Sequence, residues 1–241
     1  MSDLTELVIS NLTAGYEDIP IVKSVDLQVD KGKVTLIIGP NGSGKSTLLN
    51  AVFGLARVFE GQVVLNGREV THLDPSERVR LGLRFVMQRR SIFPHLTVEE
   101  NLRMGAWTVR NDKTRMTSEL AKVYDLFPIL KELRSVKANL LSGGQARILE
   151  LARGVMGDAR VLLLDEPTTG LSPKLAKQIY DYVLKLRQMG YTILLVEQNV
   201  KSGLSVADDV LVMRTGSPIY YGSANEISVK MTEIVSSWLK Y

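Results

Sequence analysis

The segment Gly39 to Ser46, which reads Gly-Pro-Asn-Gly-Ser-Gly-Lys-Ser, constrains the fold of this chain more than any other stretch. It matches the pattern G-x-x-x-x-G-K-[S/T], in which backbone N–H groups turn inward around phosphate oxygens. The apolar run Val34 to Ile38 precedes the segment, and a second apolar run, Thr47 to Phe53, follows it with helical character. A strand, a loop and a helix in that order predict a phosphate site at the helix N-terminus.

Two side chains of this loop carry the expected chemistry. Lys45 supplies a mobile ammonium for the β- and γ-phosphates of a nucleotide, and Ser46 is placed to ligate Mg2+. A glycine-rich turn would match the pattern by chance on the order of once per hundred chains, and the flanking strand and helix weaken that alternative. The nucleotide contacts expected here are Gly39, Pro40, Asn41, Gly42, Ser43, Gly44, Lys45, Ser46 and Thr47.

Two adjacent acids, Asp165 and Glu166, follow the apolar run Val161 to Leu164. They stand at the carboxyl end of a predicted buried strand, where open α/β sheets place their ligands. Beside a phosphate loop, we expect Asp165 to hold Mg2+ directly or through water, and Glu166 to orient and activate the attacking water. The alternative is an exposed strand end with two solvated carboxylates.

A second glycine-rich segment, Leu141-Ser142-Gly143-Gly144-Gln145, is separated from Val161 by fifteen residues. Ser142 is a natural cap for the amphipathic helix predicted after it. An ordinary capped helix is therefore one interpretation. However, Gly143 and Gly144 leave that helix end without side chains, which lets its backbone approach an anion closely.

Apolar strands alternate with amphipathic helices along the chain, which predicts a parallel-sheet core. The first part differs, because short strands are predicted at Leu7 to Leu12, Val22 to Val29 and Gln62 to Leu65, followed by an Asn66-Gly67 hairpin turn. Helices dominate from Arg89 to Gly157. The expected fold class is α/β, a P-loop NTPase (RecA-like) core with an N-terminal antiparallel β subdomain and an inserted α-helical subdomain. We place the β subdomain and the core in 1–88 and 158–241, and the helical subdomain in 89–157, of one domain spanning 1–241.

Two helix starts are marked by their sequence. Thr97-Val98-Glu99-Glu100 has the spacing of a capping box, in which the first and last side chains bond each other's backbone. Ser172-Pro173 places a capping hydroxyl directly before a proline suited to the first helical turn.

Composition excludes several classes of function. The chain lacks cysteine, and His72 and His95 cannot by themselves build a zinc site. Its net charge of +4 comes from 30 basic and 26 acidic residues that are intermixed, so no nucleic-acid partner is expected. The apolar runs are strand-sized, far short of the roughly 18 residues of a membrane helix, and the acidic N-terminus lacks an export signal.

Together these motifs resemble the ATP-binding cassette (ABC) ATPases over nearly the whole chain, so we expect a single ABC ATPase domain. In that family two cassettes meet head to tail, and each ATP lies between one subunit's phosphate loop and the other's Leu-Ser-Gly-Gly-Gln segment. The resemblance implies that Tyr16 stacks on adenine with Ile21 nearby, and that Gln88 reaches Mg2+ and the lytic water. It also implies trans contacts to the γ-phosphate held by the partner subunit from Ser142, Gly143, Gly144 and Gln145. The expected cofactors are ATP and Mg2+, with Ser46, Gln88 and Asp165 as metal ligands and Glu166, Gln198 and Gln88 as catalytic residues.

The chain departs from the family pattern at two places. Gln198, within Val196-Glu197-Gln198-Asn199, replaces the usual switch histidine; it can donate a hydrogen bond but carries no positive charge. Thr169-Gly170-Leu171-Ser172 stands where the family turn commonly ends in aspartate. This segment therefore lacks the aspartate through which the two ATP sites would communicate.

These departures, with the stretches Phe93 to Leu102, Gly170 to Pro173 and Leu195 to Asn199, resemble the smaller ATPase subunit of branched-chain amino-acid importers. Relatives that serve urea or short amides share the pattern. The resemblance implies a second ABC ATPase subunit as partner in a homodimer or heterodimer, transmembrane permease subunits and, indirectly, a substrate-binding protein. It places the chain peripherally at the cytoplasmic face of the cell membrane, with Arg89 to His95 as the docking stretch.

Two other classes of protein remain as alternatives. A soluble, non-transport ABC ATPase acting on DNA or ribosomes usually carries two cassettes or a long coiled-coil insertion, neither of which is found in the sequence. A P-loop kinase for a small molecule works without a paired signature, so Ser142 to Gln145 argues against it. ATP-dependent dimerisation of a Glu166→Gln variant separates these classes.

Overall fold

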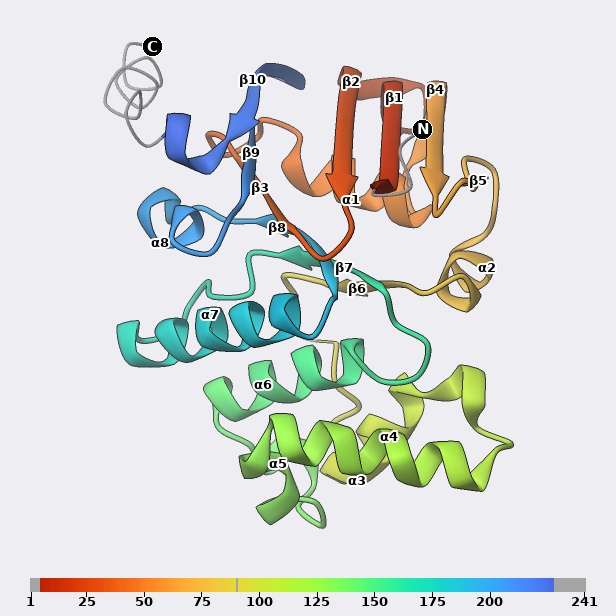
Figure 1. Ribbon diagram of the computed structural model, residues 1–241, viewed down its shortest axis with the longest axis vertical. Helices are drawn as coiled ribbons and strands as arrows, with labels where there is room; N and C mark the ends of the chain where they lie inside the picture. The colour runs from red at the N-terminus through yellow and green to blue at the C-terminus, as the bar shows by residue number, and fades with distance from the viewer. Residues whose placement is uncertain (1–4, 90, 228–241) are drawn as a thin grey trace.

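The computed structural model describes residues 5–89 and 91–227. Arg90, part of the expected docking stretch, and the end of the expected domain beyond residue 227 lie outside the described residues. Within them, two sheets and two groups of helices are stacked, with the antiparallel sheet at one end and the helices α3 to α5 at the other (Figure 1). In the described part of the chain, no helix is both long enough and apolar enough to cross a membrane.

The central sheet has six strands in the order β10-β9-β3-β8-β7-β6. All neighbours pair in parallel except β10, which is antiparallel to β9. Every residue of β3, β7 and β8 is buried, as their continuous apolar sequences predict for strands covered on both faces. The strands are β3 (Val34–Ile38), β6 (Leu83–Val86), β7 (Val161–Asp165), β8 (Thr192–Val196), β9 (Asp209–Arg214) and β10 (Ser217–Ser223).

The second sheet is antiparallel, in the order β2-β1-β4-β5. Its strands are β1 (Thr5–Tyr16), β2 (Ile19–Asp30), β4 (Arg57–Leu65) and β5 (Arg68–Glu69). The prediction of short strands is wrong in length, because bulges interrupt the apolar alternation: Asn11 and Ser24 have positive φ angles of 46° and 47° where the pairing register shifts. The Asn66-Gly67 turn does join β4 to β5, with Leu65 opposite Arg68.

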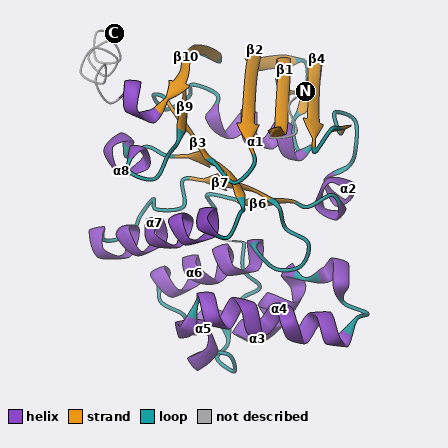
Figure 2. Ribbon diagram, in the orientation of Figure 1, coloured by secondary structure: helices purple, strands orange, loops and turns teal. Residues whose placement is uncertain are grey.

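Helix α1 (Lys45–Phe53) lies between the two sheets (Figure 2). Its Leu48, Leu49 and Val52 are fully buried in one cluster with the antiparallel sheet and with one face of the central sheet. The short helix α2 (Pro75–Arg80) packs beside β6, and its Arg78 donates hydrogen bonds to the carbonyls of Ala51 and Val52 in the last turn of α1.

The remaining helices lie on the other side of the central sheet. Their buried side chains form one continuous cluster with that face of the sheet, so the boundaries 89–157 of the helical subdomain stay a prediction. The helices are α3 (Val98–Gly105), α4 (Lys113–Leu126), α5 (Pro128–Glu132), α6 (Gly143–Gly154), α7 (Pro173–Gln188) and α8 (Val200–Leu204), with 3₁₀ turns at Trp107–Val109 and Ala138–Leu140.

Two predicted helix starts are found in place. Thr97 and Glu100 form both bonds of the capping box at α3. Ser172 occupies the N-cap of α7 directly before Pro173, but its side chain makes no capping hydrogen bond. The position was therefore predicted correctly and the bond was not.

Candidate nucleotide site

The phosphate loop connects β3 to α1 and is built around its glycines. Gly42 and Gly44 have φ angles of 78° and 94°, in the left-handed region that favours glycine. A Cβ at Gly39 would lie 2.2 Å from the carbonyl oxygen of Met213 on β9, so only glycine fits there. Gly44 is the N-cap of α1 and offers no side chain to it, which leaves the first-turn N–H groups available to an anion.

Lys45 is 5% exposed and is held by its own loop. Its Nζ donates hydrogen bonds to the carbonyl oxygens of Gly39 at 2.9 Å and Pro40 at 3.0 Å. Burial lowers the pKa of this ammonium, while the nearby charges of Glu166 and Asp165 oppose the shift. The two loop carbonyls therefore hold the ammonium at the position where the phosphates of a nucleotide would bind.

Two oxygen donors suited to a divalent cation lie side by side. The Ser46 hydroxyl donates a 3.1 Å hydrogen bond to Oδ1 of Asp165, the last residue of β7. Asp165 is 5% exposed, and burial raises its pKa, while the bond from Ser46 acts in the opposite direction. A hydroxyl and a buried carboxylate from different elements match the hard-oxygen preference of Mg2+.

Glu166 is the meeting point of the site. Gln88 Nε2 donates to its Oε2 at 2.6 Å, and Gln198 Nε2 lies 2.8 Å from both carboxylate oxygens. Thr169 Oγ also donates to Oε2, at 3.0 Å, a contact that the sequence did not predict. The sequence gives no signal for this contact, because it forms only when the loop after β7 brings Thr169 back to the Glu166 carboxylate. Glu166 itself has a φ of 47°, a left-handed conformation that a glutamate rarely adopts.

Lys45, Ser46, Gln88, Glu166 and Gln198 line a cavity of about 510 Å³, called the ATP cavity below. Tyr16 lies outside its lining; this side chain is 40% exposed, and its hydroxyl accepts a 2.6 Å hydrogen bond from Asn50 of α1. Most of the nucleotide contacts expected from the sequence do gather here. The lining consists of Ile21, Asn41, Gly42, Gly44, Lys45, Ser46, Thr47, Gln88, Glu166 and Gln198.

The segment Ser142 to Gln145, called the signature segment below, starts α6 and does not line the ATP cavity. Ser142 Oγ accepts from the Gln145 backbone at 3.3 Å, and the Gln145 side chain accepts from the Ser142 backbone at 2.9 Å. Ser142 and Gly143 are exposed, whereas Gly144 is buried against Leu175 of α7, where a Cβ would lie 2.7 Å from a Leu175 methyl carbon. Packing therefore explains Gly144, and the bare helix end that the sequence predicted is offered mainly by Gly143.

Comparison with known proteins identifies this arrangement. Residues 22–169 match the family model described as ABC transporter, which is more than half of the chain. The chain belongs to the ABC transporter family. It is an ATPase subunit of that family, and its cassette binds ATP.

Relatives and solved structures of the ABC transporter family agree with this placement. The probable branched-chain amino acid transport ATP-binding protein LivF of Archaeoglobus fulgidus is 46% identical over 217 residues, covering 90% of this chain and 91% of that one. The crystal structure of an ATP-binding cassette in its ADP conformation superposes with a TM-score of 0.84 at 30% identity, covering 99% of this chain and all of the other. A dimeric cassette bound to ADP and phosphate after hydrolysis gives 0.80 at 25% identity, over 90% of this chain and 98% of that one.

Proposed function

We propose that this ABC ATPase powers the import of branched-chain amino acids. The proposed cargo rests on one observation: the chain is 46% identical, over nine tenths of both chains, to a relative named as a branched-chain amino acid transport ATP-binding protein. The ATP cavity supports the chemistry: Lys45 and Glu166 line it, and Asp165, at the end of β7, accepts a hydrogen bond from the lining residue Ser46.

The residues in and beside the ATP cavity have separate tasks in this proposal. Lys45 releases its carbonyl partners and binds the β- and γ-phosphates, while the first turn of α1 binds them through its N–H groups. Glu166 accepts the proton of the attacking water as the bond between the γ-phosphorus and the bridging oxygen breaks, which yields ADP and phosphate. Gln198 donates its amide hydrogen bond to the γ-phosphate. Tyr16 and Ile21 contact the adenine.

Mg2+ fits the oxygen donors found at this site. Ser46 Oγ and Asp165 Oδ1 would hold the ion, and Gln88 Oε1 is free to join them because the amide nitrogen of Gln88 is the atom bonded to Glu166. When bound, the ion neutralises charge on the β- and γ-phosphate oxygens. The pKa of Asp165, raised by burial, would fall beside such a cation.

The active unit in this proposal is a head-to-tail pair of ABC ATPase subunits. The signature segment of one chain presents the open end of α6 to the nucleotide in the other chain's ATP cavity. Two facts support this: the signature segment lies outside the ATP cavity of its own chain, and the dimeric cassette with ADP and phosphate resembles this fold with a TM-score of 0.80. A subunit alone then binds ATP but hydrolyses it poorly, because half of the γ-phosphate contacts are missing.

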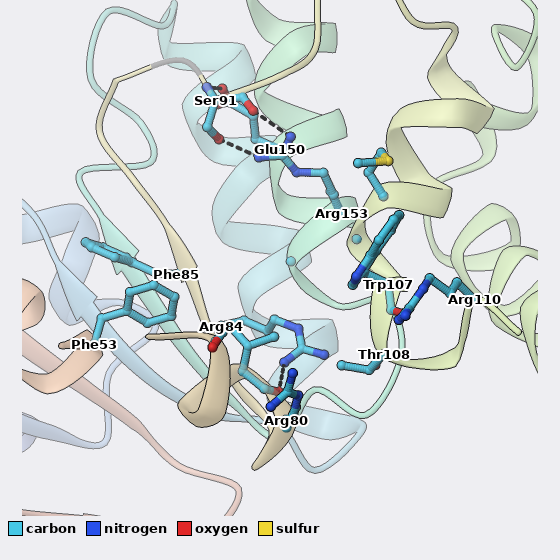
Figure 3. A pocket seen from close by; sticks show the side chains of 15 residues that line it. Phe53, Arg80, Arg84, Phe85, Ser91, Trp107, Thr108, Arg110, Glu150 and Arg153 are labelled. Carbon is cyan, nitrogen blue, oxygen red and sulfur yellow. Dashed lines mark hydrogen bonds between the residues drawn. The ribbon is translucent and has the colours of Figure 1, made fainter. Parts of the chain in front are cut away.

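The membrane partners would dock at a second cavity, of about 480 Å³, between α2 and β6 on one side and the 3₁₀ turn Trp107–Val109 on the other (Figure 3). Its lining includes Arg80, Arg84, Arg110 and Arg153, and the Arg110 guanidinium stacks 4.5 Å from the centre of the Trp107 ring, which is 54% exposed. A cationic, aromatic groove suits a permease segment that bears carboxylates. Within the expected docking stretch Arg89 to His95, Ser91 lines this groove.

This docking places the chain at the cytoplasmic face of the membrane as a peripheral subunit. Trp107→Ala is expected to weaken assembly with the permease subunits in a pull-down while leaving nucleotide binding intact. Wild-type assembly of this variant would exclude the groove as the docking site.

The cargo is tested with the complete transporter in proteoliposomes. ATP hydrolysis and uptake are measured with leucine, isoleucine or valine and the binding protein, against urea and short amides. We expect stimulation by the branched-chain amino acids. Stimulation only by urea or amides would reassign the cargo. An ATP hydrolysis rate that is the same with and without the permease subunits would favour a non-transport ATPase.

A further inference from the structure

A buried carboxylate that the mechanism above does not use lies directly before Gln198. Glu197 is 1% exposed, and its Oε1 accepts a 2.8 Å hydrogen bond from Thr168 Oγ. The Thr168 hydroxyl lies 3.2 Å from the hydroxyl of Tyr180 on α7. Burial raises the pKa of Glu197, and hydrogen bonds from Thr168 and Tyr180 act against that shift. A carboxylate is costly to bury unless hydrogen bonds satisfy it.

The loops that follow β7 and β8 leave the central sheet together. β7 and β8 are parallel neighbours, with Asp165 opposite Val196, so the loop carrying Glu166 and the loop carrying Gln198 emerge side by side. The Glu166 N–H continues the pairing by donating to the carbonyl of Val196 at 2.9 Å. Just beyond the end of β8, Gln198 lines the ATP cavity, whereas Glu197 does not line it and accepts its hydrogen bond from Thr168 instead.

The two loops are consequently fastened to each other on both sides. On the side of the ATP cavity, Gln198 donates to Glu166. On the far side, Thr168 donates to Glu197, and Tyr180 joins this pair to α7. Thr168 stands two residues after Glu166, and Glu197 stands one residue before Gln198, so the second link fixes the spacing of the first.

We infer that Glu197 is a positioning residue for ATP hydrolysis: through Thr168 and Tyr180 it holds the loop after β8 so that Gln198 stays against Glu166. The inference rests on the proposed roles of Glu166 and Gln198. Loosening the loop by an ångström is expected to slow hydrolysis by about 10-fold or more, since misplacement on that scale in a catalytic site costs up to ~10²-fold. ATP binding depends on the phosphate loop and is expected to stay unchanged.

The test measures steady-state ATP hydrolysis by the assembled transporter. Glu197→Ala and Thr168→Val are expected to lower kcat about 10-fold while the KM for ATP stays within about twofold. Glu197→Gln is expected to restore most of kcat, because its amide oxygen still accepts from Thr168. In a Gln198→Ala background, Glu197→Ala is expected to cause no further loss, because the group that it positions is gone.

Thr192→Val is the matched control. Thr192, at the other end of β8, is 1% exposed, and its hydroxyl accepts a 3.0 Å hydrogen bond from the Gly32 backbone. This variant also loses a buried threonine hydrogen bond, but far from Gln198, so its melting temperature is expected to fall without a change in kcat.

The outcomes separate this inference from the proposed function. A wild-type kcat in Glu197→Ala, alongside a slowed Gln198→Ala, overturns the positioning role and leaves the ATPase mechanism standing. Fully additive losses in the double variant also overturn it, because Glu197 would then act independently of Gln198. A wild-type rate in Gln198→Ala refutes the proposed role of Gln198 and the inference with it.

Discussion

Glu166 combines a left-handed backbone with a carboxylate that three side chains contact. Its φ of 47° and its contacts with Gln88, Thr169 and Gln198 both require surrounding structure to hold it, which is typical of strained functional residues. Among the described residues, Oε1 accepts a side-chain hydrogen bond only from Gln198, so it has room to accept one from a water molecule.

The first prediction concerns the charge of this carboxylate. Glu166→Gln keeps the size of the side chain but cannot take a proton, so we expect the ATP turnover rate to fall by about 10²- to 10⁴-fold while ATP binding is retained. An ATP-bound dimer should accumulate and elute early in gel filtration with ATP. A turnover rate equal to that of the wild type would remove Glu166 from the role of base.

The second prediction uses the buried charge of Glu197. Its pKa is raised by burial, so the folded state binds a proton more readily than the unfolded state, and stability falls as pH rises from the unfolded pKa, near 4.5, through the folded one. Glu197→Gln removes this pH-dependent contribution to stability, because the amide does not titrate. The difference in melting temperature between variant and wild type, measured without nucleotide, should therefore favour the variant increasingly as the pH rises from 4.5 through the raised pKa of Glu197. A difference that does not vary with pH would contradict the raised pKa.

Among the secondary-structure elements, α1 depends on its neighbour α2 for its C-terminal end. Arg78 of α2 is 1% exposed and also donates to the carbonyls of Thr71 and Leu73, besides those of Ala51 and Val52. The last carbonyls of a helix lack intrahelical partners. The Ala51 carbonyl also accepts from the Gly54 N–H at 3.1 Å, and the guanidinium of Arg78 donates to both the Ala51 and the Val52 carbonyl.

Replacing Arg78 tests that dependence. Arg78→Leu removes the guanidinium donor from the carbonyls of Val52, Thr71 and Leu73, so we expect the free energy of unfolding to fall by about 3 kcal/mol or more, at roughly 1–3 kcal/mol for each unsatisfied group. Arg103→Leu is the control, because the ion pair of Arg103 with Glu99 on α3 is half exposed and should contribute no more than about 0.5 kcal/mol. Equal losses in chemical denaturation would show that Arg78 does not stabilise the end of α1.

The start of α6 gives a prediction about packing between helices. Alanine is favoured over glycine within a helix by about 1 kcal/mol, yet Gly144→Ala would place its Cβ 2.7 Å from a Leu175 methyl carbon. We expect this overpacking to destabilise the protein by about 1–3 kcal/mol. The double variant Gly144→Ala with Leu175→Ala should recover part of the loss in thermal unfolding. If Gly144→Ala alone stabilised the protein, the Leu175 side chain of α7 would be shown to move aside at little cost.

Across the whole molecule, the sequence predicted the features that are local in the chain. The phosphate loop, the acids at the end of β7 and the capped start of α6 each lie within a few residues, so their geometry follows from strand, loop and helix rules. Contacts between distant segments were missed. Thr168 with Glu197, and Gly144 with Leu175, depend on which strands and helices become neighbours. The bulged strands β1 and β2 were predicted too short for a related reason, since their pairing partners extend them past the polar interruptions.

The last prediction addresses the separation of the two functional surfaces within one chain. The ATP cavity and the signature segment do not share lining residues, and in the proposed dimer a complete site takes one from each subunit. Lys45→Ala removes the ammonium that binds the phosphates, and Ser142→Arg blocks the N-terminal end of α6. Each variant alone should lose ATP hydrolysis. Mixed together as a homodimer, they form one intact site in each mixed pair, and about a quarter of the wild-type rate is expected for random pairing. With a second ATPase subunit as the natural partner, each variant is instead combined with the complementary variant of that subunit. Absence of recovery in both arrangements would show that the two surfaces do not meet across a dimer.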